Sequence, residues 1–329
     1  MAEYKGIKGF KVQYLSADPS NPIVGQIWYN DTSKNLKFTE FAAGAWASAT
    51  GMPQGRRNLS AAGIQTAALA FGGYEQFGSP QAGYTNTTFE YDGSTWTSGG
   101  TLGSAMYGNR GFGIQTAAVN AGGMTDPGAR TTLTQLYDGT TWTPTGSLAS
   151  TVAFGSAAGI QTAGFYAGGT NPGAVAQSAT EEFNGSTWTT GGALNTARIV
   201  LVSVGTQTAG LATGGDTPAA TAATEEYDGS SWTTVNGLNT GRGYLMGFGI
   251  QTNAVAYGGS VPPPRSNLTE LYDGTSWTSS TNYPIGVGGG AGAGTSQAGL
   301  GISGTATAVV QTVNEWTGPG PATKTVTVS

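Results

Sequence analysis

Two pairs of neighbouring glutamates are the side chains of this sequence best suited to acid–base chemistry. Glu181-Glu182 and Glu225-Glu226 each supply the two carboxyl groups that glycoside cleavage requires. Adjacent residues of an extended strand point to opposite faces, however, so the two carboxyls of one pair do not meet at one substrate. Both pairs occupy the same place in a repeated block, and we therefore predict that they make structural hydrogen bonds to a neighbouring module.

Other catalytic chemistry is limited by the residue types that the sequence lacks. It contains no histidine and no cysteine, which excludes imidazole and thiolate ligands and the usual base for a serine nucleophile. A calcium site at Asp126 or Asp216 would rest on a single carboxylate, so it is an unfavoured alternative. The glycine-rich stretch at 286–294 has no following Gly-Lys-Ser or Gly-Lys-Thr, so it does not predict a phosphate loop. We expect no catalytic residue, no metal and no cofactor.

The charges are few and unevenly distributed. The formal net charge is −5, and five of the lysines lie within the first 37 residues, which leaves the remainder acidic. An acidic surface repels phosphate backbones, so nucleic-acid binding is not expected. The N-terminus lacks the apolar segment of a signal peptide and is expected to begin the mature chain, and no stretch has the roughly 20 apolar residues of a membrane-inserted span.

A block of residues repeats along most of the sequence and determines the predicted architecture. Each copy contains a turn of the Gly-Ile-Gln-Thr type, an apolar run ending in Gly-Gly, a variable loop, and an aromatic residue before Asp-Gly. The aromatic position recurs every 44 to 46 residues, at Tyr91, Tyr137, Phe183, Tyr227, Tyr272 and Trp316. This period, with short extended runs and no helical pattern of apolar residues, predicts an all-β array of stacked modules.

One copy, residues 104–145, illustrates the predicted four-stranded antiparallel module. Asp138-Gly139 separates two extended runs and predicts a type I′ turn with positive φ at both residues. Such a sheet buries its faces only against neighbouring copies, and closing the stack into a ring predicts a β-propeller. Tryptophans on the outermost strands are expected to fill the wedges between blades: Trp46, Trp96, Trp142, Trp188, Trp232 and Trp277.

The domain boundaries depend on how the first 50 residues are used. We predict an attachment segment at 1–24, in which 8–15 can supply the first, innermost strand of a first blade. A first blade or β-hairpin arm follows at 25–50, and six repeats follow at 51–329. Phe41 precedes Trp46 by the same five residues that separate Tyr91 from Trp96. This match favours seven four-stranded blades, each of consecutive chain, with the last strand at 322–329 and a seam held by face packing alone. Six blades preceded by an N-terminal β-hairpin arm is the alternative.

The predicted recognition surface lies at the end of the ring that carries the variable loops. These loops join the second and third strands of each module, and loops on a rigid scaffold commonly bind ligands. The candidate binding residues are Tyr74, Phe77, Tyr84, Asp126, Arg130, Asp216 and Arg265. This mixture of aromatic and polar groups suits a sugar or a protein surface. The candidates for attachment to an acidic partner are Lys5, Lys8, Phe10 and Lys11.

The repeated block resembles the kelch repeat. The shared features are the paired glycines, the aromatic before Asp-Gly, the strand tryptophan, and an arginine near the start of a unit, namely Arg57, Arg110, Arg198 and Arg242. More narrowly, the Gly-Ile-Gln-Thr-Ala motif and the opening Tyr-Lys-Gly-Ile-Lys-Gly-Phe motif are similar to sequences in kelch-like proteins of tailed bacteriophages from marine and cyanobacterial hosts. The third and last units lack the arginine, and the last lacks the Gly-Gly pair.

The resemblance implies a component of a phage particle, displayed on the capsid or the tail. We therefore expect a non-enzymatic virion protein that adheres to the host surface or decorates the particle. Its expected partners are other virion proteins, a host cell-surface glycan or protein, and further copies of itself. A glycan-active, hydrolase-type propeller of a tail fibre is the alternative function.

Overall fold

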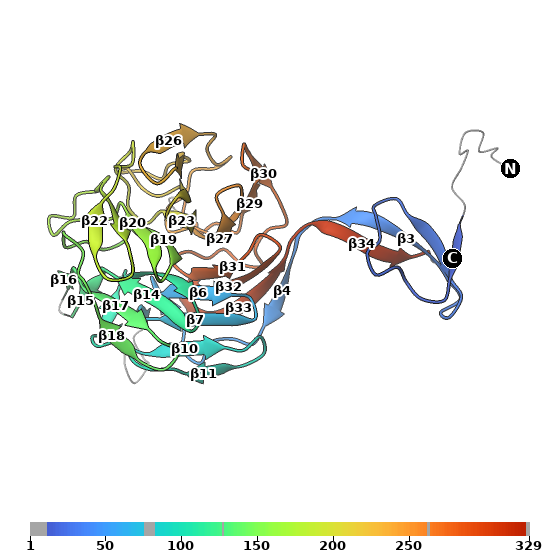
Figure 1. Ribbon diagram of the computed structural model, residues 1–329, viewed down its shortest axis with the longest axis horizontal. Helices are drawn as coiled ribbons and strands as arrows, with labels where there is room; N and C mark the ends of the chain where they lie inside the picture. The colour runs from blue at the N-terminus through green and yellow to red at the C-terminus, as the bar shows by residue number, and fades with distance from the viewer. Residues whose placement is uncertain (1–11, 76–82, 127, 262–263, 327–329) are drawn as a thin grey trace. The chain divides into compact units, whose positions relative to one another are not determined.

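Every regular element of the protein is a β-strand in the part of the chain that the computed structural model describes, residues 12–75, 83–126, 128–261 and 264–326 (Figure 1). This confirms the predicted all-β fold. No helix among these residues has the length and apolar character to cross a membrane. The chain divides into two units, one of Met1–Ala45 with Gly318–Ser329 and one of Trp46–Thr317.

The larger unit is a β-propeller, and six four-stranded sheets among its described residues are the blades. The first two blades contain β6 (Ser60–Ile64), β7 (Ala67–Phe71), β10 (Thr88–Tyr91) and β11 (Trp96–Ser98), then β13 (Arg110–Ile114), β14 (Ala117–Ala121), β17 (Thr134–Tyr137) and β18 (Trp142–Pro144). The third and fourth contain β19 (Ser156–Ile160), β20 (Ala163–Ala167), β21 (Thr180–Phe183) and β22 (Trp188–Thr190), then β23 (Val202–Thr206), β24 (Ala209–Thr213), β25 (Thr224–Tyr227) and β26 (Trp232–Val235). The fifth and sixth contain β27 (Met246–Ile250), β28 (Asn253–Tyr257), β29 (Thr269–Tyr272) and β30 (Trp277–Ser279), then β31 (Ala291–Gly294), β32 (Ala298–Thr305), β33 (Val309–Thr317) and β4 (Ala45–Ala49).

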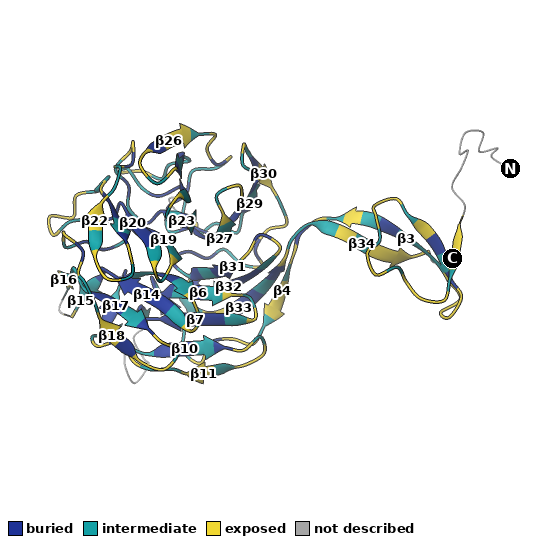
Figure 2. Cartoon of the chain, in the orientation of Figure 1, coloured by how far each residue is buried: buried dark blue, intermediate teal, exposed yellow. Residues whose placement is uncertain are grey.

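The blades meet face to face, and the hydrophobic core lies in the wedges between them. The second strand of each blade is buried almost throughout because a neighbouring blade covers each of its faces (Figure 2). Between the third and fourth blades, for example, Phe165 packs against Trp232 and Tyr227, with ring centroids 5.6 and 5.9 Å apart. The innermost strands, β6, β13, β19, β23, β27 and β31, contact one another in a closed circle.

The sixth blade combines strands from both parts of the chain and corrects the predicted blade number. Its outermost strand is β4, which lies beside β33 although the two strands are far apart in sequence (Figure 1). Trp46 of β4 packs against Trp316 and Tyr283, at centroid distances of 5.1 and 4.8 Å, and its indole N–H donates to Thr269 Oγ1 at 3.1 Å. The favoured seven blades are therefore corrected to six. The seam is held by strand pairing and not by face packing alone, because β4 supplies the strand that the C-terminal repeat lacks.

The smaller unit contains a separate sheet, in the order β1 (Gln13–Leu15), β2 (Ile27–Asn30), β3 (Asn35–Ala42) and β34 (Gly320–Thr325). Here β1 pairs with β2 in parallel, so the described part of the predicted strand at 8–15 does not supply a blade strand, while residues 8–11 lie outside the described residues. Strand β34 pairs with β3 instead of completing the last blade. Asp18 accepts hydrogen bonds from Asn30 and from the buried Trp28, and pairs with Lys37. The bond from Lys37, with those from Asn30 and Trp28, lowers the pKa of Asp18 to about 2. Segment 25–50 thus divides between a hairpin in this unit and β4 of the propeller.

Glutamates and tyrosines on the third strands join successive blades near the aromatic-Asp-Gly turns. Tyr227 donates to Glu182 Oε1 at 2.5 Å, and the same bond joins Tyr137 to Glu90, Tyr272 to Glu226, and Tyr91 to Glu315. Where the aromatic residue has no phenol, as at Phe183 and Trp316, a leucine replaces the glutamate, Leu136 and Leu271 respectively. Glu181, the neighbour of Glu182, accepts a hydrogen bond from the amide of Ala149. Both carboxylates of this pair therefore make structural hydrogen bonds, which confirms the structural interpretation of the glutamate pairs.

The turns at this end of the propeller, here called the turn end, differ in detail from the predictions. Gly139 has a φ of +94°, but the preceding aspartate does not have positive φ, so the type I′ prediction is wrong. Asp138 Oδ1 accepts the amides of Thr140 and Thr141 and holds the turn. The Gln of the Ile-Gln-Thr turn also bonds across blades, since Gln115 Nε2 donates to the carbonyls of Ala68 and Tyr91 at 3.0 and 2.8 Å.

The arginines at the start of the repeats occupy two different environments. Arg198 and Arg242 are fully buried and pair with Glu225 and Glu270 at 2.8 Å. In the first blade the equivalent residue is Arg56, which lies 3.6 Å from Glu75, and not Arg57 as the repeat pattern predicts. Arg110 does not belong to this set, because Met106 occupies the equivalent position of the second blade and Arg110 begins the inner strand β13.

Candidate functional site at the mouth end

A ring of backbone hydrogen bonds surrounds the centre of the propeller at the end opposite the turn end, here called the mouth end. Each blade contributes one residue just before its inner strand, and we call this set the collar: Asn58, Gly108, Phe154, Val200, Tyr244 and Gly289. The amide of each collar residue donates to the carbonyl of the collar residue in the preceding blade, at distances from 2.5 to 3.1 Å. The bond from Asn58 to Gly289 joins the first and sixth blades, so the ring is complete.

All the collar residues adopt positive φ, including four that are not glycine. Val200 has a φ of +50° and Tyr244 of +53°, a conformation that is uncommon for non-glycine residues and an outlier for a β-branched one. Backbone strain of this kind costs about 1–3 kcal/mol per residue and is found preferentially at functional sites. At the collar, closure of the hydrogen-bonded ring therefore takes precedence over the φ values that these residues ordinarily adopt.

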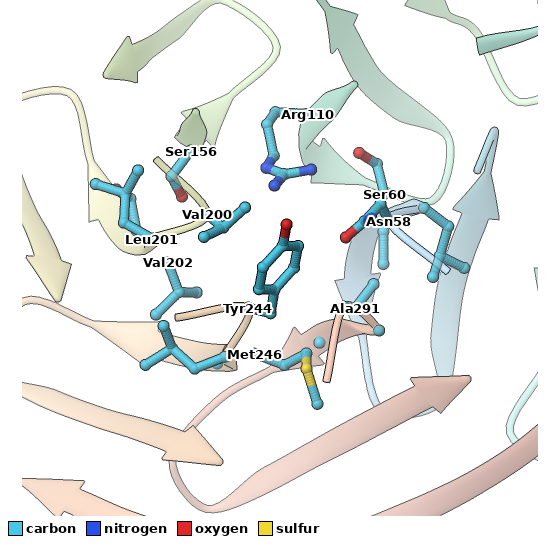
Figure 3. A pocket seen from close by; sticks show the side chains of 18 of the residues that line it. Asn58, Ser60, Arg110, Ser156, Val200, Leu201, Val202, Tyr244, Met246 and Ala291 are labelled. Atoms are coloured by element: carbon cyan, nitrogen blue, oxygen red, sulfur yellow. The ribbon is translucent and has the colours of Figure 1, made fainter. Parts of the chain in front are cut away.

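A central cavity of about 90 Å³ lies within the collar and the first residues of the inner strands. All six inner strands line it, with Ser60, Arg110, Ser156, Val202, Met246 and Ala291 at equivalent positions. Figure 3 shows the side chains of Arg110, Tyr244, Ser156 and Ser60 around the same space. Arg110 is the one charged residue in this lining, all of which is described by the structure.

The Arg110 guanidinium is held in place by backbone carbonyls. Its Nε donates to Gly155 O at 2.5 Å and its Nη1 to Asn109 O at 2.8 Å. Burial lowers the pKa of Arg110, because the charged form loses water contacts. No carboxylate among the described residues pairs with it. The cavity therefore contains a fixed, uncompensated positive charge.

Tyr244 connects the cavity with two of the predicted binding residues. Burial raises the pKa of its phenol, and the charge of Asp216 raises it further. The Arg265 guanidinium lies 5.7 Å from the centroid of the Tyr244 ring, within the range of a cation–π contact. Burial also raises the pKa of Asp216 itself. Asp216 and Arg265, which come from different loops, are thus brought together by a tyrosine that sequence reasoning did not select.

An aromatic cluster lies beside the collar and contains two further predicted residues. Tyr84 on β9 (Gly83–Tyr84) stacks on Tyr107 of β12 (Met106–Tyr107), with ring centroids 5.4 Å apart. Tyr74 of β8 (Tyr74–Glu75) contacts both rings edge-on, and β8 also pairs with β5 (Arg56–Arg57). The Tyr107 hydroxyl accepts from Asn58 Nδ2 at 2.9 Å, which joins this cluster to the collar.

The remaining predicted residues lie apart from the cavity or outside the described residues. Asp126 is exposed between β15 (Met124–Thr125) and β16 (Ala129–Arg130), and its charge contributes to the raised pKa of Tyr84, after burial and Tyr107. Arg130 Nε donates to Thr170 Oγ1 at 2.8 Å. Phe77, Lys5, Lys8, Phe10 and Lys11 lie outside the described residues. Within the described part, no group of three or more His, Cys, Asp or Glu side chains is arranged to hold a metal ion.

The predicted blade tryptophans lie on β4 and on the outermost strands β11, β18, β22, β26 and β30. Trp142, Trp232 and Trp277 are buried, whereas Trp46, Trp96 and Trp188 are partly exposed. Each indole N–H donates to the preceding blade, for example Trp232 to Thr180 Oγ1 at 2.9 Å.

Sequence reasoning missed the residues of the central cavity, although the repeats contain a signal for one of them. Aligning the residue three positions before each Gly-Ile-type turn gives Ser60, Arg110, Ser156, Val202, Met246 and Ala291. Arg110 is the single charged member of that series. Tyr244 and Ser203, which also line the cavity, give no comparable signal, because only the circular arrangement of the inner strands brings them there.

Larger hollows also exist at the mouth end among the described residues. One of about 510 Å³ lies between the second and third blades and includes Glu181. Its carboxylate already accepts the amide of Ala149 at 2.7 Å. The central cavity is smaller but is the stronger candidate, because Arg110 has no carboxylate partner there and the buried Ser203 hydroxyl is unpaired.

Comparison with known proteins supports the fold. No protein-family model and no curated protein matches the sequence. A solved structure of the protein YjhT is similar to this chain, with a TM-score of 0.67 over 84% of this chain and 100% of YjhT, at 11% sequence identity. At this identity the likeness establishes a shared arrangement of sheets and nothing about activity.

Proposed function

We propose that the chain is a non-enzymatic recognition protein of a bacteriophage particle. In this proposal the propeller binds a ligand at its mouth end, and the smaller unit attaches to another virion protein of the capsid or tail. The bacteriophage origin rests on the sequence resemblance. The assignment of attachment to the smaller unit and of ligand binding to the propeller rests on one observation, the uneven distribution of exposed apolar side chains between the two units.

Exposed large apolar residues are concentrated in the smaller unit. Its described part contains Val12, Tyr14, Ile23, Val24, Ile27, Phe41 and Val326, whereas the described part of the much larger propeller exposes Ile64, Ile114, Ile160, Val175 and Ile250. Tyr14, Ile23 and Phe41 are 77%, 71% and 65% exposed. Concentrations of exposed apolar surface are typical of sites that bind another macromolecule. The unit that contains both ends of this sequence is therefore the better candidate for attachment.

The hydrogen-bond and ion-pair partners of the paired glutamates support a non-enzymatic role. Glu182 and Glu226 accept hydrogen bonds from tyrosines of the next blade, and Glu225 is paired with Arg198. Since these carboxylates stabilise contacts within the propeller, they are not available as the acid and the nucleophile of a glycosidase. Adhesion to the host surface, or decoration of the particle, remains as the role of the mouth end.

The attachment proposal is tested with substitutions in the smaller unit. Deleting residues 1–24 would also remove Asp18 and its bond to the buried Trp28, so point substitutions are the sharper test. We expect the triple variant Tyr14→Ser, Ile23→Ser, Phe41→Ser to fold but to be absent from purified particles, as measured by mass spectrometry. A matched control in the propeller is Ile64→Ser, Ile114→Ser, Ile160→Ser, which should remain on the particles.

Two results would contradict the proposal. Retention of the first triple variant on particles at the wild-type level would refute attachment through the smaller unit. Release of reducing ends when the purified chain is incubated with host polysaccharide would refute the non-enzymatic role and favour a glycan-active propeller.

A further inference from the structure

The central cavity contains a cation whose charge the protein does not neutralise. The other arginines at the starts of repeats, Arg56, Arg198 and Arg242, each lie beside a glutamate. Arg110 has only neutral carbonyl partners within the described chain. A guanidinium has five N–H donors, and two of them make these bonds, which leaves donors on its outer edge for a ligand. Because a poorly hydrated charge without a counter-ion is unfavourable, an anion at this edge would be stabilised.

Neutral hydrogen-bonding groups around Arg110 also lack partners. Neither the Tyr244 hydroxyl nor Ser156 Oγ forms a hydrogen bond with any described residue, and both side chains face the same space as Arg110 (Figure 3). Ser203 also lines the cavity, and its hydroxyl is unpaired although the residue is only 7% exposed. A buried polar group without a partner costs about 1–3 kcal/mol, so the buried Ser203 hydroxyl is a second and independent indication of a missing ligand.

The charge and the volume of the cavity restrict the ligand. With a single uncompensated cation in the lining, the site balances one negative charge better than the roughly −1.5 to −2 of a phosphate group at pH 7. A cavity of about 90 Å³ accepts a small group and not a whole sugar ring. A planar, singly charged carboxylate also matches the planar edge of a guanidinium.

We propose that the central cavity binds a carboxylate group, with Arg110 as its charge partner and with Tyr244 and Ser156 as hydroxyl donors. Its biological meaning rests on the recognition role proposed above, but its chemistry is a property of the purified chain. The rest of a larger ligand would extend toward the aromatic cluster of Tyr74, Tyr84 and Tyr107. The carboxylate is borne either by a small free acid or by such a larger ligand.

The test uses the full chain and measures its thermal midpoint as acetate replaces chloride at constant ionic strength. A ligand that binds only the folded state raises the midpoint in a saturable manner. We expect such a rise with acetate, none with the neutral acetamide, and less with inorganic phosphate. Phenylacetate separates the two sources of the carboxylate: tighter binding than acetate indicates a ligand that continues over the aromatic cluster, and equal binding indicates a small acid.

Substitutions assign the effect to the cavity. Arg110→Met should weaken acetate binding by about 10- to 100-fold, as expected for hydrogen bonds to a charged group. Tyr244→Phe should weaken it by about 2- to 10-fold, and this milder change keeps the test decisive if Arg110→Met does not fold. Arg130→Met is the matched control, because Arg130 lies at the mouth end but does not line the cavity, and it should leave the affinity unchanged.

The proposal is overturned if acetate and acetamide give the same midpoint, if folded Arg110→Met or Tyr244→Phe binds acetate like the wild type, or if phosphate binds at least as tightly as acetate. None of these results depends on phage particles. Failure of carboxylate binding therefore leaves the attachment proposal standing, and loss of the attachment proposal leaves the cavity assignment standing.

Discussion

At the turn end of the propeller the blades repeat the same contacts, whereas at the mouth end the blades contribute different residues to one cavity. Tyr–Glu bonds, glutamine bonds to neighbouring carbonyls and tryptophan–threonine bonds recur around the ring with small variations. Around the central cavity, by contrast, one equivalent position is occupied by arginine, serine, valine, methionine and alanine in different blades.

This difference separates the groups that hold the ring together from those available to a ligand. A contact that recurs between successive blades stabilises each interface in the same way, as nearest-neighbour contacts do in repeat proteins. A residue that occurs once cannot serve all interfaces, and Arg110 is not needed for the pairing that the other arginines provide. We therefore expect substitutions in the repeated contacts to change stability and substitutions in the cavity to change binding.

The largest effect on stability is expected at Trp46, which repeats the tryptophan contact although it comes from the N-terminal part of the chain. Truncating a tryptophan that packs in a hydrophobic core costs about 3–5 kcal/mol, and Trp46, although partly exposed, packs against Trp316 and Tyr283. Trp46→Ala should therefore lower the free energy of unfolding by a comparable amount in urea titrations. Trp96→Ala is the control and should cost less, because Trp96 contacts Tyr91 but bonds only the carbonyl of Thr50. Equal losses would show that ring closure by β4 adds nothing to stability.

The next largest effect is expected for the Tyr–Glu bond. Glu182→Leu leaves the buried Tyr227 hydroxyl without its carboxylate, and we expect a loss of about 1.5–3 kcal/mol in the free energy of unfolding. The double variant Glu182→Leu, Tyr227→Phe recreates the Leu136–Phe183 pair of the preceding interface and should recover most of that loss. A double variant no more stable than the single one would contradict complementarity between these positions. Acetate binding should be unchanged in both.

Alkaline pH tests the same bonds together. Burial, with the nearby carboxylates, raises the pKa of Tyr91, Tyr137 and Tyr227 to about 12 from an ordinary value of about 10. The folded state thus retains the phenol protons longer, so the contribution of these groups is complete below pH 10 and is lost as the pH rises toward 12. The urea midpoint should fall over this window, and less so in Tyr227→Phe. A midpoint independent of pH there would rule out phenolic stabilisation.

The smallest effect is expected in the Asp-Gly turns. Hydrogen bonds from the Ser231 amide and from Ser230 lower the pKa of Asp228 to about 2. The contribution of this carboxylate is present above its ordinary pKa near 4 and is lost as the pH falls toward 2. Asp228→Asn should keep the turn, since Asn184 fills that position in the third blade, and should reduce the acid sensitivity of the urea midpoint. An unchanged acid profile would show that Asp228 does not contribute.

Particular residues show which features of the fold could be predicted from the sequence and which could not. The aromatic-Asp-Gly spacing was sufficient for the four-stranded module and the propeller, because both follow from local turns and period-2 burial. The sequence favoured seven blades and left the six of the structure as the alternative, although it contained a clue. Tyr91 of the first repeat bonds Glu315 of the last only if six blades close the ring. Phe41 and Trp46 share the spacing of a blade yet lie in different units.

The sequence by itself determined the strands, the positions of the turns, the aromatic wedges and the structural use of the glutamate pairs, because each of these depends on residues close together in the chain or repeated along it. The tertiary structure alone decided that β4 completes the last blade, and that Arg110, Tyr244 and Ser203 surround one cavity. The physical reason is that a closed ring brings together inner strands from every repeat. Arg110, Tyr244 and Ser203 do not occupy equivalent repeat positions, so local spacing does not specify that they meet at its centre.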